Sequence, residues 1–185
     1  MKNTLCALLI CVLLLASCAK DAAPNPFLIS KNHIGLLTDS TQVRDLETIF
    51  SNDSVVRYIA GDEFTGSVNT IEVFEKTGKK LLDLSPREAL DSTSVISSVR
   101  IIDERYKTEK NISTLSTFKD INETYKISKI DNLINAIVVS VNEINASFTI
   151  DKTELPASLR FDMDMTIDPI QIPGKAKIKF FMVHW

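Results

Sequence analysis

Apolar residues recur at helical spacing in two short stretches of the chain, residues 41–50 and 116–125. Each stretch carries apolar or aromatic side chains at positions i, i+3 and i+7, which lie on one face of a helix. Serine or threonine stands at the start of both stretches, and these residues favour the N-cap position. The stretches align at a constant offset of 75 residues. The pattern therefore predicts two short, related helices.

An alternating pattern typical of a β-hairpin follows each predicted helix. In the first hairpin, Thr77-Gly78 supplies a turn in which glycine allows a positive φ angle. The predicted strands cover residues 71–76 with 79–84, and residues 137–141 with 146–150. The predicted cross-strand pairs are Ile71–Leu84, Val73–Leu82, Ile137–Ile150 and Val139–Phe148.

Two helix-plus-hairpin units in tandem predict an α+β fold of mostly antiparallel β-sheet with short helices, built from two degenerate tandem repeats. We expect one compact domain over residues 31–185, made of related halves at about 31–94 and 95–185. Further strands are expected over residues 55–60 and 95–102. The alternative to duplication is that two unrelated helix–hairpin units resemble each other.

Residues 161–168 and 175–180 alternate strictly between apolar and polar residues, which indicates two strands. An antiparallel register places Asp168 opposite Lys175 and Asp164 opposite Lys179, with apolar pairs on the other face. We expect cross-strand ion pairs here rather than a calcium site, because carboxylates along a strand do not converge on one ion.

The last residues, 180–185, are unusually apolar for a chain terminus. We expect them to be tucked into the sheet, because a frayed apolar strand would expose an aggregation-prone edge. The alternative is a docking surface for a partner, formed by Phe181, Val183 and Trp185.

Residues 1–17 resemble a secretory signal, with a basic start and an apolar run too short to span a bilayer as a helix. The segment Leu15-Ala16-Ser17-Cys18 resembles a bacterial lipobox, which implies removal of residues 1–17 and lipidation of Cys18. Acyl chains on Cys18 would anchor the protein to a membrane. Residues 18–30, with two prolines, are expected to form a flexible tether.

The residue after the lipidation site is Ala19 rather than aspartate, and aspartate there would resemble the inner-membrane retention signal of enteric bacteria. We therefore expect an outer-membrane anchor, with the domain facing the periplasm or the cell surface. All three cysteines fall within residues 1–18. The mature chain thus offers no free thiol for a disulfide, a zinc site or a nucleophile.

The charge balance argues against nucleic acid as a partner. One of the 21 basic residues, Lys2, lies in the signal, so 20 basic residues stand against 24 acidic ones and the formal net charge of the mature chain becomes −4. Nucleic-acid binding favours a basic surface, because the phosphate backbone dominates affinity.

Motifs that carry chemistry are sparse. The two histidines, His33 and His184, stand near opposite ends of the chain, and the sequence has no nucleophile elbow, phosphate loop or zinc-binding helix motif. We therefore expect no catalytic residues, no cofactor and no metal site. Two weaker candidates are an anion site at the start of the second helix, against ordinary N-capping, and a carboxylate clamp. The clamp would require Arg87, Arg100 and Arg105 to cluster.

The mature chain resembles a group of small Gram-negative lipoproteins of unknown function. The residues that carry this resemblance are Ile34-Gly-Leu-Leu-Thr38, Ser116-Thr-Phe-Lys-Asp120, the segment Glu154-Leu-Pro-Ala-Ser-Leu-Arg160 and the Ile-Pro and Ala-Lys-Ile-Lys residues of 172–179. No catalytic residues come with it.

Two more distant similarities bear on the fold. The segment beginning Ile34-Gly-Leu-Leu-Thr is similar to the opening of the small lipoprotein of the β-barrel assembly machine. A tandem helix-plus-sheet repeat near 75 residues is similar to the β-lactamase inhibitor protein. Both are binding proteins, and these similarities bear on the fold class alone.

These observations predict an outer-membrane-anchored lipoprotein that acts as a non-enzymatic binding or structural module in the cell envelope. Its expected partners are the membrane, through the lipid anchor, and a protein or envelope component. The alternatives are a periplasmic carboxylate-dependent hydrolase, marked by a pocket with two nearby carboxylates, and a proteinaceous enzyme inhibitor, marked by a protruding loop with an exposed aromatic.

Overall fold

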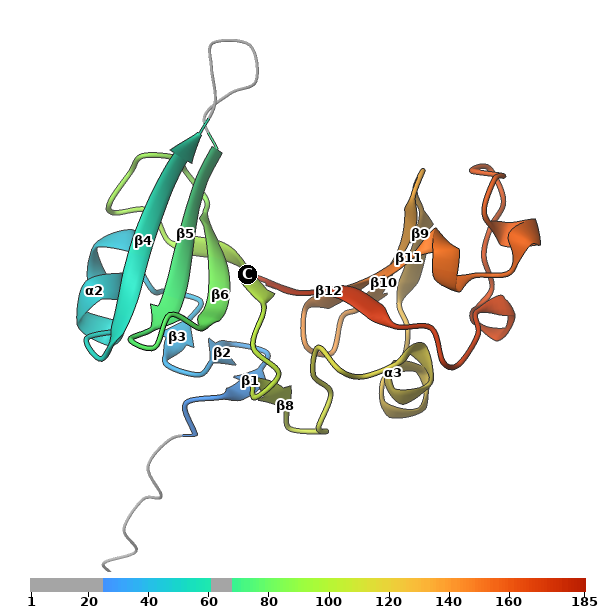
Figure 1. Cartoon of the computed structure of the whole chain (residues 1–185), viewed down its shortest axis with the longest axis horizontal. Helices are drawn as coiled ribbons and strands as arrows, with labels where there is room; N and C mark the ends of the chain where they lie inside the picture. The colour runs from blue at the N-terminus through green and yellow to red at the C-terminus, as the bar shows by residue number, and fades with distance from the viewer. Residues whose placement is uncertain (1–24, 61–67) are drawn as a thin grey trace, which may run out of the picture.

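The computed structural model describes residues 25–60 and 68–185 (Figure 1). The predicted signal, Cys18 and most of the predicted tether lie outside these described residues. Within them, no helix is both long enough and apolar enough to cross a membrane. The fold is mostly antiparallel β-sheet with a few short helices, as the sequence predicts.

A small sheet forms at the start of the described chain. Its strands run in the order β3-β2-β1-β8. They span Leu37–Thr38, His33–Ile34, Leu28–Ser30 and Lys107–Thr108. The predicted tether therefore ends too late. Ile29 is fully buried, and the rings of Phe27 and Tyr106 meet edge to face at 5.1 Å, so residues 27–30 belong to the folded domain.

The large sheet has eight strands in the order β4-β5-β6-β7-β12-β11-β10-β9. In chain order they are β4 (Asp53–Ala60), β5 (Val68–Glu75), β6 (Lys80–Pro86), β7 (Ile96–Ile101), β9 (Lys129–Asn132), β10 (Ala136–Val141), β11 (Ala146–Asp151) and β12 (Ile178–His184). Every neighbouring pair is antiparallel.

The sheet consists of two four-stranded meanders that meet at the pair β7–β12. Figure 1 shows β4, β5 and β6 rising on one side, β9, β10 and β11 on the other, and β12 crossing between them. A short helix precedes each meander, α2 (Leu46–Ile49) before the first and α3 (Phe118–Thr124) before the second. Helix α2 directly continues the 3-10 helix η2 (Val43–Asp45), so the first predicted helix is part 3-10 and part α-helical.

Both predicted hairpins form in the predicted register. Val73 pairs with Leu82, Val139 with Phe148 and Ile137 with Ile150. Gly78 adopts the expected positive φ of 89° in the first turn. The alternating pattern succeeds because burial of one sheet face fixes the register: a slip by one residue would expose every apolar side chain.

The apolar faces of the two helical stretches are also confirmed. Their members at i, i+3 and i+7 all join the core, with exposed fractions of 5% or less for Val43, Leu46, Phe50, Phe118, Ile121 and Tyr125. The opposite face of the large sheet carries half-exposed polar residues. Ser98, Arg100 and Ser147 lie there.

The predicted C-terminal hairpin is wrong. Residues 161–168 form no strand, and Lys179 pairs with Asp151 at 2.8 Å instead of Asp164. The physical reason is that β12 is central: β11 and β7 occupy both of its edges, so residues 161–168 have no free edge to join. Their aspartates favour turns, and Asp162 accepts a hydrogen bond from the backbone N–H of Asp164.

The apolar C-terminus lies in the middle of the sheet. Phe181 and Val183 are fully buried, which leaves neither side chain free to dock a partner. Trp185 is half-buried, and its indole N–H donates to the carbonyl oxygen of Lys31 at 3.2 Å. Of the three residues considered from the sequence as a docking surface, only Trp185 is therefore partly exposed.

Candidate functional site

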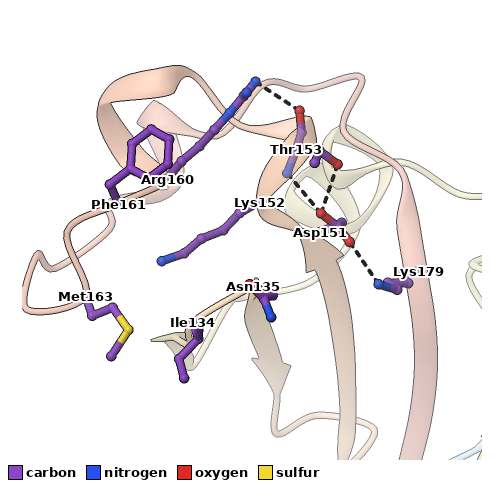
Figure 2. A pocket seen from close by; sticks show the side chains of 9 residues that line it. All are labelled: Ile134, Asn135, Asp151, Lys152, Thr153, Arg160, Phe161, Met163 and Lys179. Carbon is purple, nitrogen blue, oxygen red and sulfur yellow. Dashed lines mark hydrogen bonds and ion pairs between the residues drawn. The ribbon is translucent and has the colours of Figure 1, made fainter.

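A pocket of about 680 Å³ lies beside the turn that joins the edge strand β9 to β10. Four parts of the chain form its walls: the turn between β9 and β10, the end of β11 with the 3-10 helix η3 (Lys152–Glu154), the segment after the 3-10 helix η4 (Ala157–Leu159), and the start of β12. Figure 2 shows the side chain of Lys152 extending into the space between these walls.

Lys152 owes its inward position to the end of strand β11. The carboxylate of Asp151 accepts hydrogen bonds from the backbone N–H and the hydroxyl of Thr153, at 3.0 and 2.9 Å, and so turns the chain into η3. The backbone N–H of Lys152 donates to the carbonyl oxygen of Asn135 at 3.0 Å. These bonds hold the lysine backbone against the β9–β10 turn.

Lys152 is only 4% exposed, and its Nζ atom has no hydrogen-bond partner among the described residues 25–60 and 68–185. Lysine is almost never buried without a partner, because an unpaired charge in a protein interior costs several kcal/mol. A buried polar group in this state calls for an explanation, and a bound ligand, ion or water that supplies the missing partner is one.

Arg160 closes the loop above Lys152. Its Nε donates to the carbonyl oxygen of Leu155 at 2.8 Å, and its Nη2 donates to that of Thr153 at 3.1 Å. Leu155 and Leu159, which belong to this loop, are buried. The guanidinium thus fixes residues 153–160 over the pocket and brings a second positive charge to its wall (Figure 2).

The carboxylate in the pocket wall is already engaged. Asp151 forms an ion pair with Lys179 at 2.8 Å. The hydrogen bonds from Lys179 and from Thr153 hold the pKa of Asp151 well below its usual range. Because this carboxylate is paired with Lys179, it does not neutralise the charge of Lys152.

Exposed apolar side chains surround the pocket opening. Phe161 is 86% exposed, Ile134 69% and Met163 51%. All three line the pocket (Figure 2). The rim is therefore apolar, whereas the floor carries positive charge.

Asn132 at the end of β9 positions one wall of the pocket. Its side-chain amide donates to the backbone carbonyl oxygens of Asp162, Met163 and Met165, at 2.9, 3.3 and 3.0 Å. These bonds hold the segment 162–165 beside the sheet edge and place Met163 next to the opening.

A second arrangement involves Ser147 on β11 and His184 on β12. The Nε2 of His184 lies 2.8 Å from the Oγ of Ser147, and partial desolvation lowers the pKa of His184. The residues that line the adjacent pocket include no carboxylate to orient the imidazole; they are Ser140, Asn142, Asn145, Ala146, Ser147, His184 and Trp185. Ser147 is in a strand paired on both sides, where backbone N–H groups serve the ladders instead of an oxyanion hole.

Two buried carboxylates outside these pockets form ion pairs. Asp83 is bound by Lys80 and Arg100, and Asp103 by Lys79 and Arg105. Because Arg100 and Arg105 serve different carboxylates, the clamp considered from the sequence is not formed. Asp103 is only 2% exposed, although it opens a charged stretch of the sequence, residues 103–110.

The start of α3 shows ordinary capping. The carboxylate of Asp120 accepts hydrogen bonds from the backbone N–H and the hydroxyl of Thr117, at 2.7 and 2.9 Å. No group of three His, Cys, Asp or Glu side chains within the described part of the chain is placed to hold a metal ion.

Sequence reasoning missed the Lys152 pocket entirely. Lys152 follows a strand in a polar stretch, where a lysine is expected to be exposed. The Ser147–His184 contact was also missed, since the two residues are 37 positions apart and meet only through the β11–β12 pairing. The burial of Phe181 and Val183 was the favoured expectation, and the lipidation site Cys18 lies outside the described residues.

Comparisons with known proteins give the fold and little more. No protein-family model matches the chain, and no curated protein matches it. Among solved structures, the chain is similar to the uncharacterized protein yfeY from Escherichia coli, with a TM-score of 0.57 and 12% sequence identity. The similarity covers 85% of this chain and 99% of that one. At this identity the likeness concerns the fold alone.

Proposed function

We propose that the protein is a lipoprotein of the outer membrane that acts as a non-enzymatic binding module in the cell envelope, with the Lys152 pocket as its ligand site. The observation that carries the binding role is the buried Nζ of Lys152, which has no partner among the described residues and belongs to a side chain that lines a pocket of about 680 Å³. The anchor rests on the resemblance of residues 15–18 to a lipobox, and the resemblance to small Gram-negative lipoproteins is part of this proposal.

The arrangement of polar groups supports binding over catalysis. The Lys152 pocket is lined by one carboxylate, Asp151, which an ion pair holds ionised, whereas a carboxylate hydrolase needs two with separated roles. The hydroxyl of Thr153 is engaged with the same carboxylate. The Ser147–His184 pair lacks an orienting acid among its pocket residues.

We further propose that the two halves arose by duplication. Each half runs helix, then four-stranded antiparallel meander, and the two meanders meet in the middle of the sheet. A binding protein assembled this way gains a wide sheet without a second domain.

The test has two parts. Cells fed an alkynyl palmitate should label the wild-type chain and leave Cys18→Ala unlabelled, with the labelled protein in outer-membrane fractions. The purified protein should turn over no ester, amide, glycoside or phosphate-ester substrate in a way that depends on Ser147 or Asp151. Absence of label on the wild type would refute the anchor, and turnover lost in Ser147→Ala or Asp151→Asn would refute the non-enzymatic role.

A second candidate, an enzyme inhibitor, is favoured by one observation: Phe161 is an aromatic, 86% exposed, on an irregular segment. A photo-crosslinking phenylalanine analogue at position 161 tests it in intact cells. A single protein adduct that is absent when the analogue replaces Ile170, which is 89% exposed, would support inhibition. Equal adducts from both positions would exclude it.

A further inference from the structure

We propose that the Lys152 pocket binds a single-chain anionic amphiphile, with the anionic head group at Lys152 Nζ and the alkyl chain against Ile134, Phe161 and Met163. This inference rests on the proposed binding function and names the chemical class of its ligand. Figure 2 shows the three apolar side chains and the lysine around one common space.

The charges of the pocket select an anion. Three cationic side chains, Lys152, Arg160 and Lys179, line it against one carboxylate, which is paired with Lys179 at 2.8 Å. The whole chain has a formal net charge of −3, so this local excess of positive charge runs against the overall balance. A ligand anion at Nζ would supply the counter-charge that the described residues leave out.

The apolar rim selects a ligand with a hydrocarbon part. Ten large hydrophobic side chains are exposed among the described residues, and three of them line this pocket. A bare inorganic anion would give them nothing to cover. An alkyl chain would remove their surfaces from water and gain about 25 cal/mol for each Å² buried. A pocket of about 680 Å³ is in the size range that accepts a small organic ligand.

The segment that carries Phe161 and Met163 offers the ligand a route to Lys152. Lys152 is closed off from solvent, and Phe161 and Met163 line the same pocket on the segment that Asn132 holds to β9. That segment has no ladder hydrogen bonds of its own, since residues 161–168 form no strand. The head group reaches Nζ by passing between Phe161 and Met163, whose side chains then lie along the chain.

An alkyl carboxylate and an alkyl phosphate share this chemistry. Lysine binds either as a compact cation with three rotatable donors, without the fixed fork that arginine offers to planar anions. The experiment therefore separates the two sources by competition.

The test uses the full chain, purified from membranes into phosphatidylcholine nanodiscs and photolabelled with dodecyl phosphate that carries a diazirine near the chain end. The expected adduct maps to the peptide containing Phe161 and Met163. Unlabelled dodecyl phosphate or laurate should compete, and the stronger competitor identifies the head group. Dodecyl maltoside, dodecyltrimethylammonium and methyl phosphate should not compete, because each lacks the anion or the chain.

Lys152→Met should reduce the adduct about tenfold or more, because a charge-assisted hydrogen bond is lost, while Lys152→Arg should retain most of it. The control is Lys175→Met, at an exposed lysine outside the pocket. Phe161→Ser, with Ile170→Ser as its control, repeats the test at the rim. Thermal unfolding verifies that each variant is folded.

Three outcomes would overturn the inference: no adduct, competition by the neutral chain as strong as by the anionic ones, or labelling unchanged in Lys152→Met. These outcomes are independent of palmitate labelling and of the substrate turnover tests. The proposed ligand class can therefore be refuted while the proposed lipoprotein anchor and non-enzymatic role are still supported. Conversely, an unlabelled Cys18 would remove the anchor and leave the pocket chemistry intact.

Discussion

The rings of Phe148 and Phe181 lie with their centroids 4.6 Å apart and their planes inclined by 33°. Both side chains are fully buried, and their residues are directly paired across β11 and β12. Phe181 is also paired with Ile101 on β7, so one residue touches both halves of the large sheet.

Phe181→Ala should therefore lower the free energy of unfolding by about 3–5 kcal/mol, the usual cost of removing a buried phenylalanine ring. Urea denaturation measures the loss. Phe180→Ala is the matched control, because its neighbouring ring is 37% exposed and should cost far less. Equal losses in the two variants would show that Phe181 does not hold the halves together.

Lys152→Met should make the protein more stable. The substitution keeps the buried stem and removes a charge that has no partner among the described residues, so we expect a gain of about 1–3 kcal/mol. For a domain of this size that raises Tm by about 2–4 °C for each kcal/mol. Calorimetry of the purified protein gives the shift, with Lys175→Met as the reference. A lower Tm for Lys152→Met would mean that the lysine is structural.

Asn132→Ala should free the segment 162–165. Three hydrogen bonds from the Asn132 amide to backbone carbonyls are lost, which should cost about 1–3 kcal/mol in total. Hydrogen exchange should show faster exchange at residues 161–168 and little change in β10 and β11. Asn122→Ala, at an exposed position of α3, controls for the loss of an amide. Unchanged exchange at 161–168 would argue that other contacts hold this wall.

Acid should weaken the fold through Asp103. Burial alone would raise the pKa of its carboxyl, but hydrogen bonds from Arg105 and Lys79 hold that pKa well below its usual range. A folded pKa below the unfolded value of about 3.9 gives stability that is complete above that pH and is lost as the pH falls further.

Urea titrations between pH 7 and pH 2.5 follow the effect of Asp103. Asp103→Asn should cost about 1–3 kcal/mol at neutral pH and should flatten the acid limb of the stability profile. The exposed Asp39→Asn removes one negative charge for comparison. An acid limb as steep in Asp103→Asn as in the wild type would place the acid sensitivity elsewhere.

His184 should stay neutral at pH 7. Partial desolvation of the imidazole lowers its pKa, so the folded state binds this proton less readily than the unfolded state. The stability it contributes is present above the unfolded pKa of about 6.5 and is lost as the pH falls below that value. NMR titration of the imidazole should give a pKa below 6.5, and His184→Gln should reduce the loss of stability between pH 6.5 and 5. A pKa above 6.5 would contradict this account.

Local patterns predicted the paired strands well. The Ile71–Leu84 and Val139–Phe148 pairs follow from alternation next to a turn, where register and burial enforce each other. The Thr117–Asp120 cap is equally local, since its donors and acceptor are three residues apart.

The same local patterns do not predict structure that depends on contacts between residues far apart in the sequence. Alternation in residues 161–168 is as clean as in any strand, but a strand also needs a free edge, and β12 has none. The Lys152 site depends on the loop 153–160, the β9–β10 turn and the segment 161–165 meeting around one side chain. No periodicity or motif in the sequence indicates that these three segments lie together.

The position of β12 has a consequence for how the protein is made. Strand β12 follows every other strand of the described residues and completes the centre of the sheet, so β7 and β11 each keep an open edge until residues 178–184 have been synthesised. Contacts between distant parts of a chain form slowly, because loop closure costs entropy before it is rewarded. The large sheet therefore closes only after residues 178–184 have left the ribosome, which suits a chain proposed to carry a secretory signal.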